Sequence, residues 1–197
     1  MTDDVTATEG PPREVRTERS TERGPALGSV SRARFDAPTE EVWRLLTDAE
    51  RLHEWNAVHG DLRLGGEYSI PDNASGTVLR CEPPTMFRVS WIYEDNYSEL
   101  EVRLGAVGRG ATVVEIEHIM RPEDVTSAGM SLSDGLVAAG VGWDMALSTL
   151  GRYLRGELDG PPSADASAEP SPEDLERYGE YQQAWQQVAN EALAQQQ

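Results

Sequence analysis

Histidine is the residue type in this sequence best suited to acid–base chemistry, and the chain has three histidines. His118 stands in the segment ATVVEIEHIM, on the same alternating face as Val114 and Ile116, so its side chain is expected to point inward. Two interpretations follow. His118 is either a core histidine whose ring nitrogens are satisfied by hydrogen bonds, which we favour, or a polar anchor or acid–base group at the end of an apolar pocket.

No other group of residues has the spacing of a catalytic or metal-binding motif. His53 and His59 lie in HEWNAVH, which lacks the one-turn spacing of a zinc-binding helix. The serines of GMSLSDG do not form a nucleophile elbow. The glycine-rich segment 105–110 joins two predicted strands and lacks the Lys-Ser/Thr ending of a phosphate loop, so we predict a hairpin. We therefore predict no catalytic residue, no metal and no cofactor.

Alternation shows which side chains would surround His118. In MFRVSWIY, Phe87, Val89, Trp91 and Tyr93 fall on one face of the predicted strand. The segments SELEVRL and ATVVEIEHIM alternate in the same way, with apolar residues on one side and mainly charged residues on the other. One face of the sheet is therefore apolar and aromatic, and a helix must cover it.

The covering helix is predicted at residues 133–157, where apolar residues recur in one stripe. Gly140 and Gly142 fall in its middle, where each costs about 1 kcal/mol relative to alanine. We expect something to approach the helix backbone there, either a ligand or the indole of Trp91. The predicted ligand-binding residues are Trp55, Phe87, Trp91, Tyr93, Val102, Ile116, His118, Leu136, Gly140 and Trp143. The same aromatic side chains would equally suit a solid core.

The order of elements predicts an α+β fold. A strand at 29–35 precedes two short helices within 38–55, and five strands with short connections follow between 62 and 120. Short connections imply antiparallel neighbours. We expect a curved six-stranded antiparallel sheet wrapped around the long helix at 133–157.

Several sequence segments occur in an order typical of one superfamily. They are APTEEVWRLLTDAERLHEW, Leu64-Gly65-Gly66, GTVLRCEPPTMFRVSW, GATVVEIEH and Gly142-Trp143. Over residues 28–157 the chain resembles the START/SRPBCC superfamily, in its branch similar to the activator of heat-shock protein 90 ATPase. The resemblance implies a helix-grip (Bet v-like) fold with a hydrophobic cavity between sheet and long helix, and it implies no single activity.

Composition limits the partners. The formal net charge is -18, from 35 acidic and 17 basic side chains, which repels nucleic acid and anionic lipid. No segment is apolar and long enough to predict insertion in a membrane. The N-terminus lacks the apolar region of a signal peptide, and the single cysteine, Cys81, fits a reducing compartment. We predict a cytoplasmic protein, and its Arg-, Ala- and Gly-rich composition suggests a bacterial source.

The flanking segments differ from the domain. Residues 1–27 contain few large apolar side chains and are predicted to be disordered, and residues 158–171 are predicted to be an acidic Pro/Ser/Ala linker. Residues 172–197 are predicted to be an amphipathic helix, because Ser171-Pro172 followed by acidic residues is a helix start signal. This helix would either dock on a protein partner or pack on its own domain.

The leading functional hypothesis is non-enzymatic binding of a small hydrophobic or aromatic molecule in the internal cavity. The first alternative is an enzyme of cyclase or hydrolase type that uses the same cavity. It requires a further polar cluster around His118, from Tyr68, Arg80 or Tyr93. The second alternative is a protein-interaction module resembling a co-chaperone, with the C-terminal helix as its contact.

Overall fold

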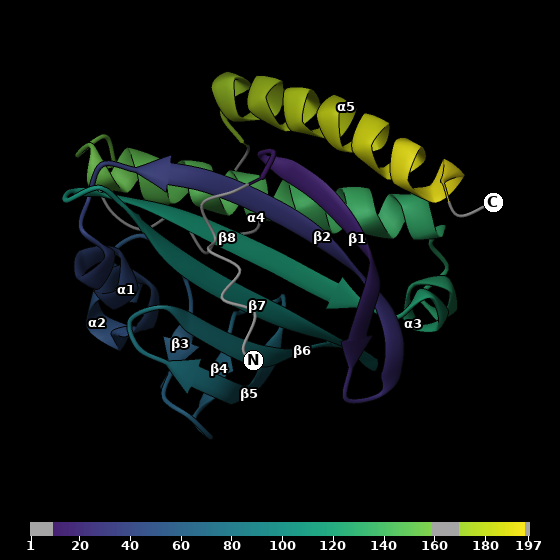
Figure 1. Ribbon diagram of the computed structural model, residues 1–197, viewed down its shortest axis with the longest axis horizontal. Coiled ribbons are helices and arrows are strands. Elements are labelled where there is room, and N and C mark those ends of the chain that lie inside the picture. The colour runs from purple at the N-terminus through teal and green to yellow at the C-terminus, as the bar shows by residue number, and fades with distance from the viewer. Residues whose placement is uncertain (1–9, 159–169, 196–197) are drawn as a thin grey trace.

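The computed structural model describes residues 10–158 and 170–195 (Figure 1). Its strands are β1 (Arg13–Thr21), β2 (Gly24–Phe35), β3 (His59–Gly60), β4 (Glu67–Ser69), β5 (Ser75–Glu82), β6 (Met86–Tyr93), β7 (Asn96–Val107) and β8 (Ala111–Met120). Its helices are α1 (Thr39–Thr47), α2 (Ala49–His53), α3 (Pro122–Ser127), α4 (Leu132–Leu154) and α5 (Pro172–Ala194).

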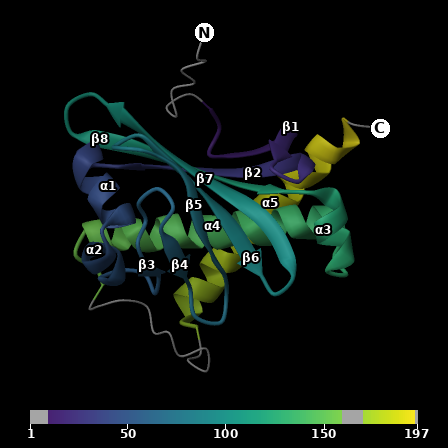
Figure 2. The ribbon, with the colours of Figure 1, turned by 90° about the horizontal axis from the view of Figure 1, so that it is seen from below.

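The strands form one antiparallel sheet in the order β1-β2-β8-β7-β6-β5-β4-β3. The long helix α4 lies across the concave face of this sheet, with α1 and α2 near one end and α3 near the other (Figure 2). The predicted helix-grip arrangement is confirmed. The sheet has eight strands instead of six, because β1 and the short β3 extend its two edges.

Two apolar clusters form the interior. The first lies between β5–β8, the helices α1 and α2, and the C-terminal half of α4, and it contains Val42, Phe87 and Leu150. The second joins β2, β8 and α3 to the N-terminal half of α4 and to α5, and it contains Leu136 and Trp185. The helix α4 therefore packs on two sides, against the sheet and against α5.

The prediction of disorder for residues 1–27 is wrong over its second half. Residues 13–21 form β1, which pairs with β2, and β2 itself begins at Gly24. The sequence REVRTERST has almost no apolar side chains to bury, so composition points to disorder. Its arginines instead find buried carboxylate partners on neighbouring strands. Residues 1–9 lie outside the described residues, as does most of the predicted linker.

The convex face of the sheet carries a buried ion-pair network. Arg16 of β1 reaches across β2 to Glu115 (3.0 Å) and Glu117 (2.8 Å), and the carboxylate-bearing side chain of Glu117 is only 1% exposed. Arg16 lies opposite Gly28 of β2. A Cβ at Gly28 would lie 2.2 Å from a Glu117 carboxylate oxygen, so the glycine leaves room for this ion pair. Burial opposes the charge of Glu115, but the Arg16 hydrogen bond and charge outweigh it and lower the pKa of that carboxyl group. Burial raises the pKa of Glu117. These ion pairs hold β1 on the edge of the sheet, although β1 has almost no apolar side chains to bury.

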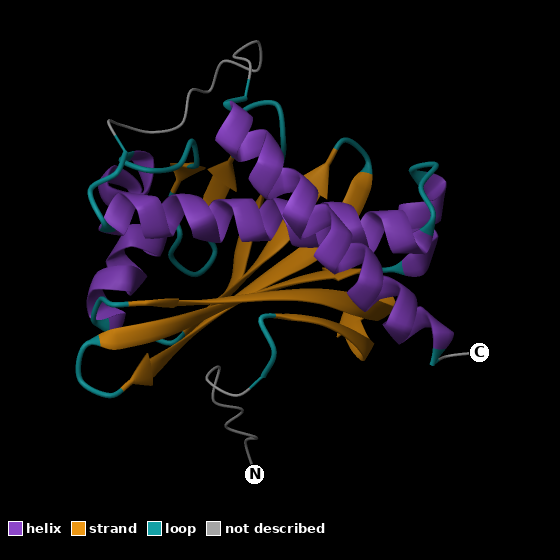
Figure 3. Ribbon diagram, turned by 90° about the horizontal axis from the view of Figure 1, so that it is seen from above, coloured by secondary structure: helices purple, strands orange, loops and turns teal. Residues whose placement is uncertain are grey.

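The C-terminal helix α5 crosses α4 on the side away from the sheet (Figure 3). It begins as its sequence predicts, with the Ser171 hydroxyl accepting a hydrogen bond from the Asp174 amide (3.1 Å). Its anchor is Trp185, which is fully buried and donates to Asp144 of α4 (2.9 Å). Arg13 of β1 also binds Asp144 (2.5 Å), so α5, α4 and β1 meet at one carboxylate. No helix in the described ranges is long and apolar enough to cross a bilayer.

Candidate functional site

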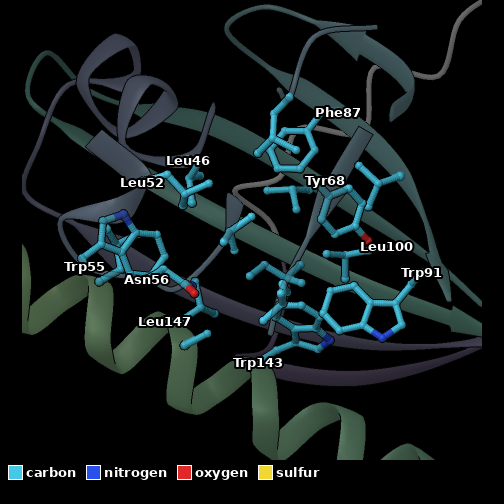
Figure 4. A pocket seen from close by; sticks show the side chains of 18 residues that line it. Leu46, Leu52, Trp55, Asn56, Tyr68, Phe87, Trp91, Leu100, Trp143 and Leu147 are labelled. Atoms are coloured by element: carbon cyan, nitrogen blue, oxygen red, sulfur yellow. The ribbon is translucent and has the colours of Figure 1, made fainter. Parts of the chain in front are cut away.

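An apolar cavity of about 80 Å³ lies between the sheet and α4 (Figure 4). Its walls come from α1, α2 and the loop after α2, from β4 and β6–β8, and from α4; they include Leu46, Trp55, Phe87, Ile116 and Leu147. Helix α2 is held in place by Asp48, whose side chain accepts from the amides of the first turn. An engineered cavity of about 150 Å³ is known to admit benzene, so this inner cavity alone is too small for an aromatic ring.

A wider groove of about 650 Å³ adjoins the inner cavity. It runs between the β6–β7 hairpin, α3 and the N-terminal half of α4, and exposed Tyr93 and Met130 lie on its lining. Its floor is aromatic and its wall on α4 is built from the small residues Gly135, Ala138, Ala139 and Gly142. A groove of this volume is within the usual range for binding sites of drug-sized molecules.

Two indoles lie between the groove and the inner cavity, where Trp91 and Trp143 are among the residues that line both. Their ring centroids are 5.1 Å apart in an edge-to-face arrangement, which is a favourable geometry for aromatic pairs. On the side of the inner cavity, the Tyr68 ring centroid lies 6.3 Å from that of Trp91. The Tyr68 hydroxyl donates to the Ser90 carbonyl oxygen (2.8 Å).

His118 holds Trp143 in this position. The Trp143 indole Nε1–H lies 3.1 Å from His118 Nδ1, and His118 Nε2 lies 2.7 Å from the Ser98 hydroxyl. An indole N–H can only donate, so Nδ1 accepts and the proton of the neutral imidazole is on Nε2. Ser98 then accepts from His118 and donates to the Trp91 carbonyl oxygen (3.3 Å). Burial lowers the pKa of His118 to about 4, which agrees with a neutral ring.

These hydrogen bonds match the first interpretation of His118, a histidine with satisfied ring nitrogens, and its side chain also lines the groove. Both ring nitrogens are used within the fold, and neither is free to exchange a proton with a substrate. The polar cluster that an enzyme would need is also not assembled: the Tyr68 hydroxyl is bound to backbone, and Arg80 is exposed and paired with Glu82 (2.6 Å). Tyr93 lies at the groove, 47% exposed.

Eight of the ten predicted ligand-binding residues line one of the two spaces. The inner cavity is lined by Trp55, Phe87, Val102 and Ile116, the groove by Tyr93 and His118, and both by Trp91 and Trp143.

The prediction is wrong for Leu136 and Gly140, which line neither space. Leu136 is fully buried in the second cluster. A Cβ at Gly140 would lie 2.2 Å from Cε2 of Trp185, so the close neighbour of this glycine is neither a ligand nor Trp91. Gly142 is the glycine at the groove, and a Cβ built there meets nothing within 4 Å.

The predicted site lacks the groove wall contributed by α3 and the loop after α2. Val125 of α3 and Met130 after it line the groove, and Asn56 lines both spaces. The signal Arg121-Pro122-Glu123 is a helix start in the sequence, and it would have indicated α3. Nothing in the sequence places Asn56 in the same lining as Trp143, because that placement depends on the tertiary fold.

Other candidate groups do not form sites. His53 and His59 are both exposed, with ring centroids 5.1 Å apart. Among the residues that the structure describes, no three His, Cys, Asp or Glu side chains converge on a metal position. Burial raises the pKa of the Cys81 thiol, which disfavours a reactive thiolate.

Comparison with known proteins gives a consistent match. Residues 36–155 match the family described as activator of Hsp90 ATPase homolog 1-like protein. The crystal structure of CalU16 from Micromonospora echinospora is 37% identical with a TM-score of 0.72, covering 90% of this chain and 96% of that one. The solution structure of CalU16 is 38% identical with a TM-score of 0.74, and the match covers 96% of this chain and 99% of that one. A conserved protein of unknown function from Enterococcus faecalis, EF2215, shares the fold at 15% identity (TM-score 0.58, covering 89% and 91%). A search of curated proteins gives no match.

Proposed function

Because the chain belongs to the activator of Hsp90 ATPase homolog 1-like family, whose fold can enclose an apolar site, we propose that it binds a small aromatic or hydrophobic molecule without transforming it. The ligand would occupy the groove between the β6–β7 hairpin and α4. Only a small apolar substituent would pass between Trp91 and Trp143 into the inner cavity, since that cavity has about 80 Å³.

One observation carries the proposal: a groove of about 650 Å³ with an aromatic floor adjoins a second, apolar space, and Trp91 and Trp143 line both. An aromatic group that buries about 200 Å² there would gain about 5 kcal/mol at 25 cal/mol/Å². This gain is enough to support binding in the groove after the costs of association are subtracted.

The polar groups favour binding over catalysis. His118 and Ser98 already complete one another's hydrogen bonds, and the Trp143 N–H is used on His118. A general base must be able to reach the proton that it removes, and this hydrogen-bonded chain has no spare acceptor of that kind. A co-chaperone role through α5 is disfavoured too, because the aromatic anchor Trp185 is buried within its own chain.

The test uses two matched glycine variants. Gly142→Leu places a side chain in the groove, where a Cβ meets nothing within 4 Å. Gly179→Leu makes the same change on α5, also with nothing within 4 Å, away from the groove. Both raise helix propensity by about 1 kcal/mol, so neither should unfold the protein.

The readout is the fluorescence of N-phenylnaphthylamine, a neutral aromatic probe. Wild type and Gly179→Leu should bind it with equal affinity, and Gly142→Leu should bind it at least about tenfold more weakly, a difference of about 1.4 kcal/mol. Equal binding by all three proteins, or no binding by wild type, would rule out the groove as the site.

A further inference from the structure

The charges around the groove are unbalanced. Two carboxylates, Glu94 and Asp124, are among the residues that line it, and no arginine is. The chain contains no lysine at all. His118 is neutral for the reasons given above. The lining therefore carries only negative formal charge.

The two carboxylates differ in their partners. Asp124 is neutralised by Arg121, which donates to both of its oxygens at 2.8 Å, and this contact lowers the pKa of Asp124. Arg23 lies beside the same end of the groove, with its guanidinium 4.0 Å from the centroid of the Tyr97 ring. Glu94, in the β6–β7 turn, makes no ion pair or side-chain hydrogen bond with any described residue.

Aromatic faces lie next to this free carboxylate. Tyr93 precedes Glu94, lines the groove and is 47% exposed. Trp91, two residues before Tyr93 in β6, also lines the groove. Aromatic faces attract cations and do not attract anions. A bound anion would lose hydration beside Glu94 and within the field of a chain with net charge -18.

We propose that the groove selects aromatic molecules that carry a protonated amine, with the ring against Trp91 and Trp143 and the ammonium group beside Glu94 and Tyr93. This inference rests on the proposed function, since it assigns a ligand class to the same groove. Glu94 is then a specificity-determining residue, and it acts on ligand charge without contributing to the apolar part of the affinity.

The experiment separates charge from apolar binding. Bound N-phenylnaphthylamine is displaced by naphthylmethylamine, which is a cation at neutral pH, or by naphthylacetate, which has the same ring and is an anion. At low salt the wild type should prefer the cation by about fivefold or more, as expected for one partly exposed ion pair of about 1 kcal/mol. The preference should decrease as salt is added.

Two variants of equal net charge provide the control. Glu94→Gln should bring the cation-to-anion ratio close to one while binding of the neutral probe stays unchanged. Asp95→Asn, in the same turn but not part of the groove lining, should keep the wild-type ratio. An equal loss of preference in both variants would assign the effect to the overall charge, and a wild type that prefers the anion or neither would overturn the inference. In those cases the neutral probe still binds and the proposed function stands; if the neutral probe does not bind, both are rejected.

Discussion

Protonation of His118 should destabilise the fold over a defined pH range. In the folded protein His118 Nδ1 accepts from Trp143, and a proton on Nδ1 would place two donors against each other. The pKa of His118 falls from 6.5 to about 4 because the ring is buried. Between these two values the unfolded chain binds more protons than the folded one, so stability falls as pH falls.

The size of the effect follows from the same two values. One pKa unit corresponds to about 1.4 kcal/mol. Between about pH 7 and about pH 5, linkage predicts that His118 alone removes about 2 kcal/mol of unfolding free energy, and the loss levels off below the folded pKa.

The assay compares urea unfolding of wild type and His118→Gln over this pH range. Glutamine supplies one acceptor for Trp143 and one donor for Ser98 but does not titrate. Carboxylates such as Glu117 titrate in both proteins and cancel in the difference. The wild type should lose about 2 kcal/mol more than the variant between about pH 7 and about pH 5. Parallel stability curves for the two proteins would refute the assigned tautomer and the role of His118 in holding Trp143.

Further substitutions test how α5 and β1 are held on the rest of the domain. Trp185→Ala should lower the unfolding free energy by about 3–5 kcal/mol, because it empties a fully buried site and leaves Asp144 without that donor; a loss below about 1 kcal/mol in urea unfolding would mean that α5 is not docked as described. Arg16→Ala should cost about 3 kcal/mol or more, because it strips buried Glu117 of a partner. Arg80→Ala, which breaks an exposed pair, should cost less than about 1 kcal/mol, and equal losses for the two arginine variants would contradict the role given to the buried network.

The core of the fold could be predicted because its signals are local. Alternation in β6 and β8 assigned Phe87, Trp91 and Ile116 to the concave face, and all three line the cavity. The apolar stripe on α4 likewise predicted that this helix covers the concave face of the sheet. These inferences need only the period of each element and the rule that an apolar face must be buried.

The strand β1 could not be predicted from composition. Arg16 and Arg19 look like solvated side chains in the sequence, but in the fold they pair with the buried carboxylates of Glu117 and Glu101. Composition measures how much apolar surface a segment can bury, and it contains no information about a charged partner about a hundred residues away.

Gly140 shows a second limit of the sequence. A glycine within a helix correctly indicated a close neighbour, but α4 has two packed faces and the sequence does not say which neighbour uses which face. Gly140 meets Trp185 of α5, whereas Gly142, two residues later, lines the groove. The sequence therefore indicates the right helix for a close contact but assigns Gly140 to the wrong neighbour.

The five tryptophans allow the central claim to be tested in one titration. Each indole N–H gives its own signal in a proton–nitrogen NMR spectrum, and N-phenylnaphthylamine can be added stepwise. Binding in the groove should shift the signals of Trp91 and Trp143 and leave those of Trp43 and Trp185, which do not line it, in place. Shifts confined to Trp185, or no shift in any of the five signals, would contradict a ligand site between the sheet and α4.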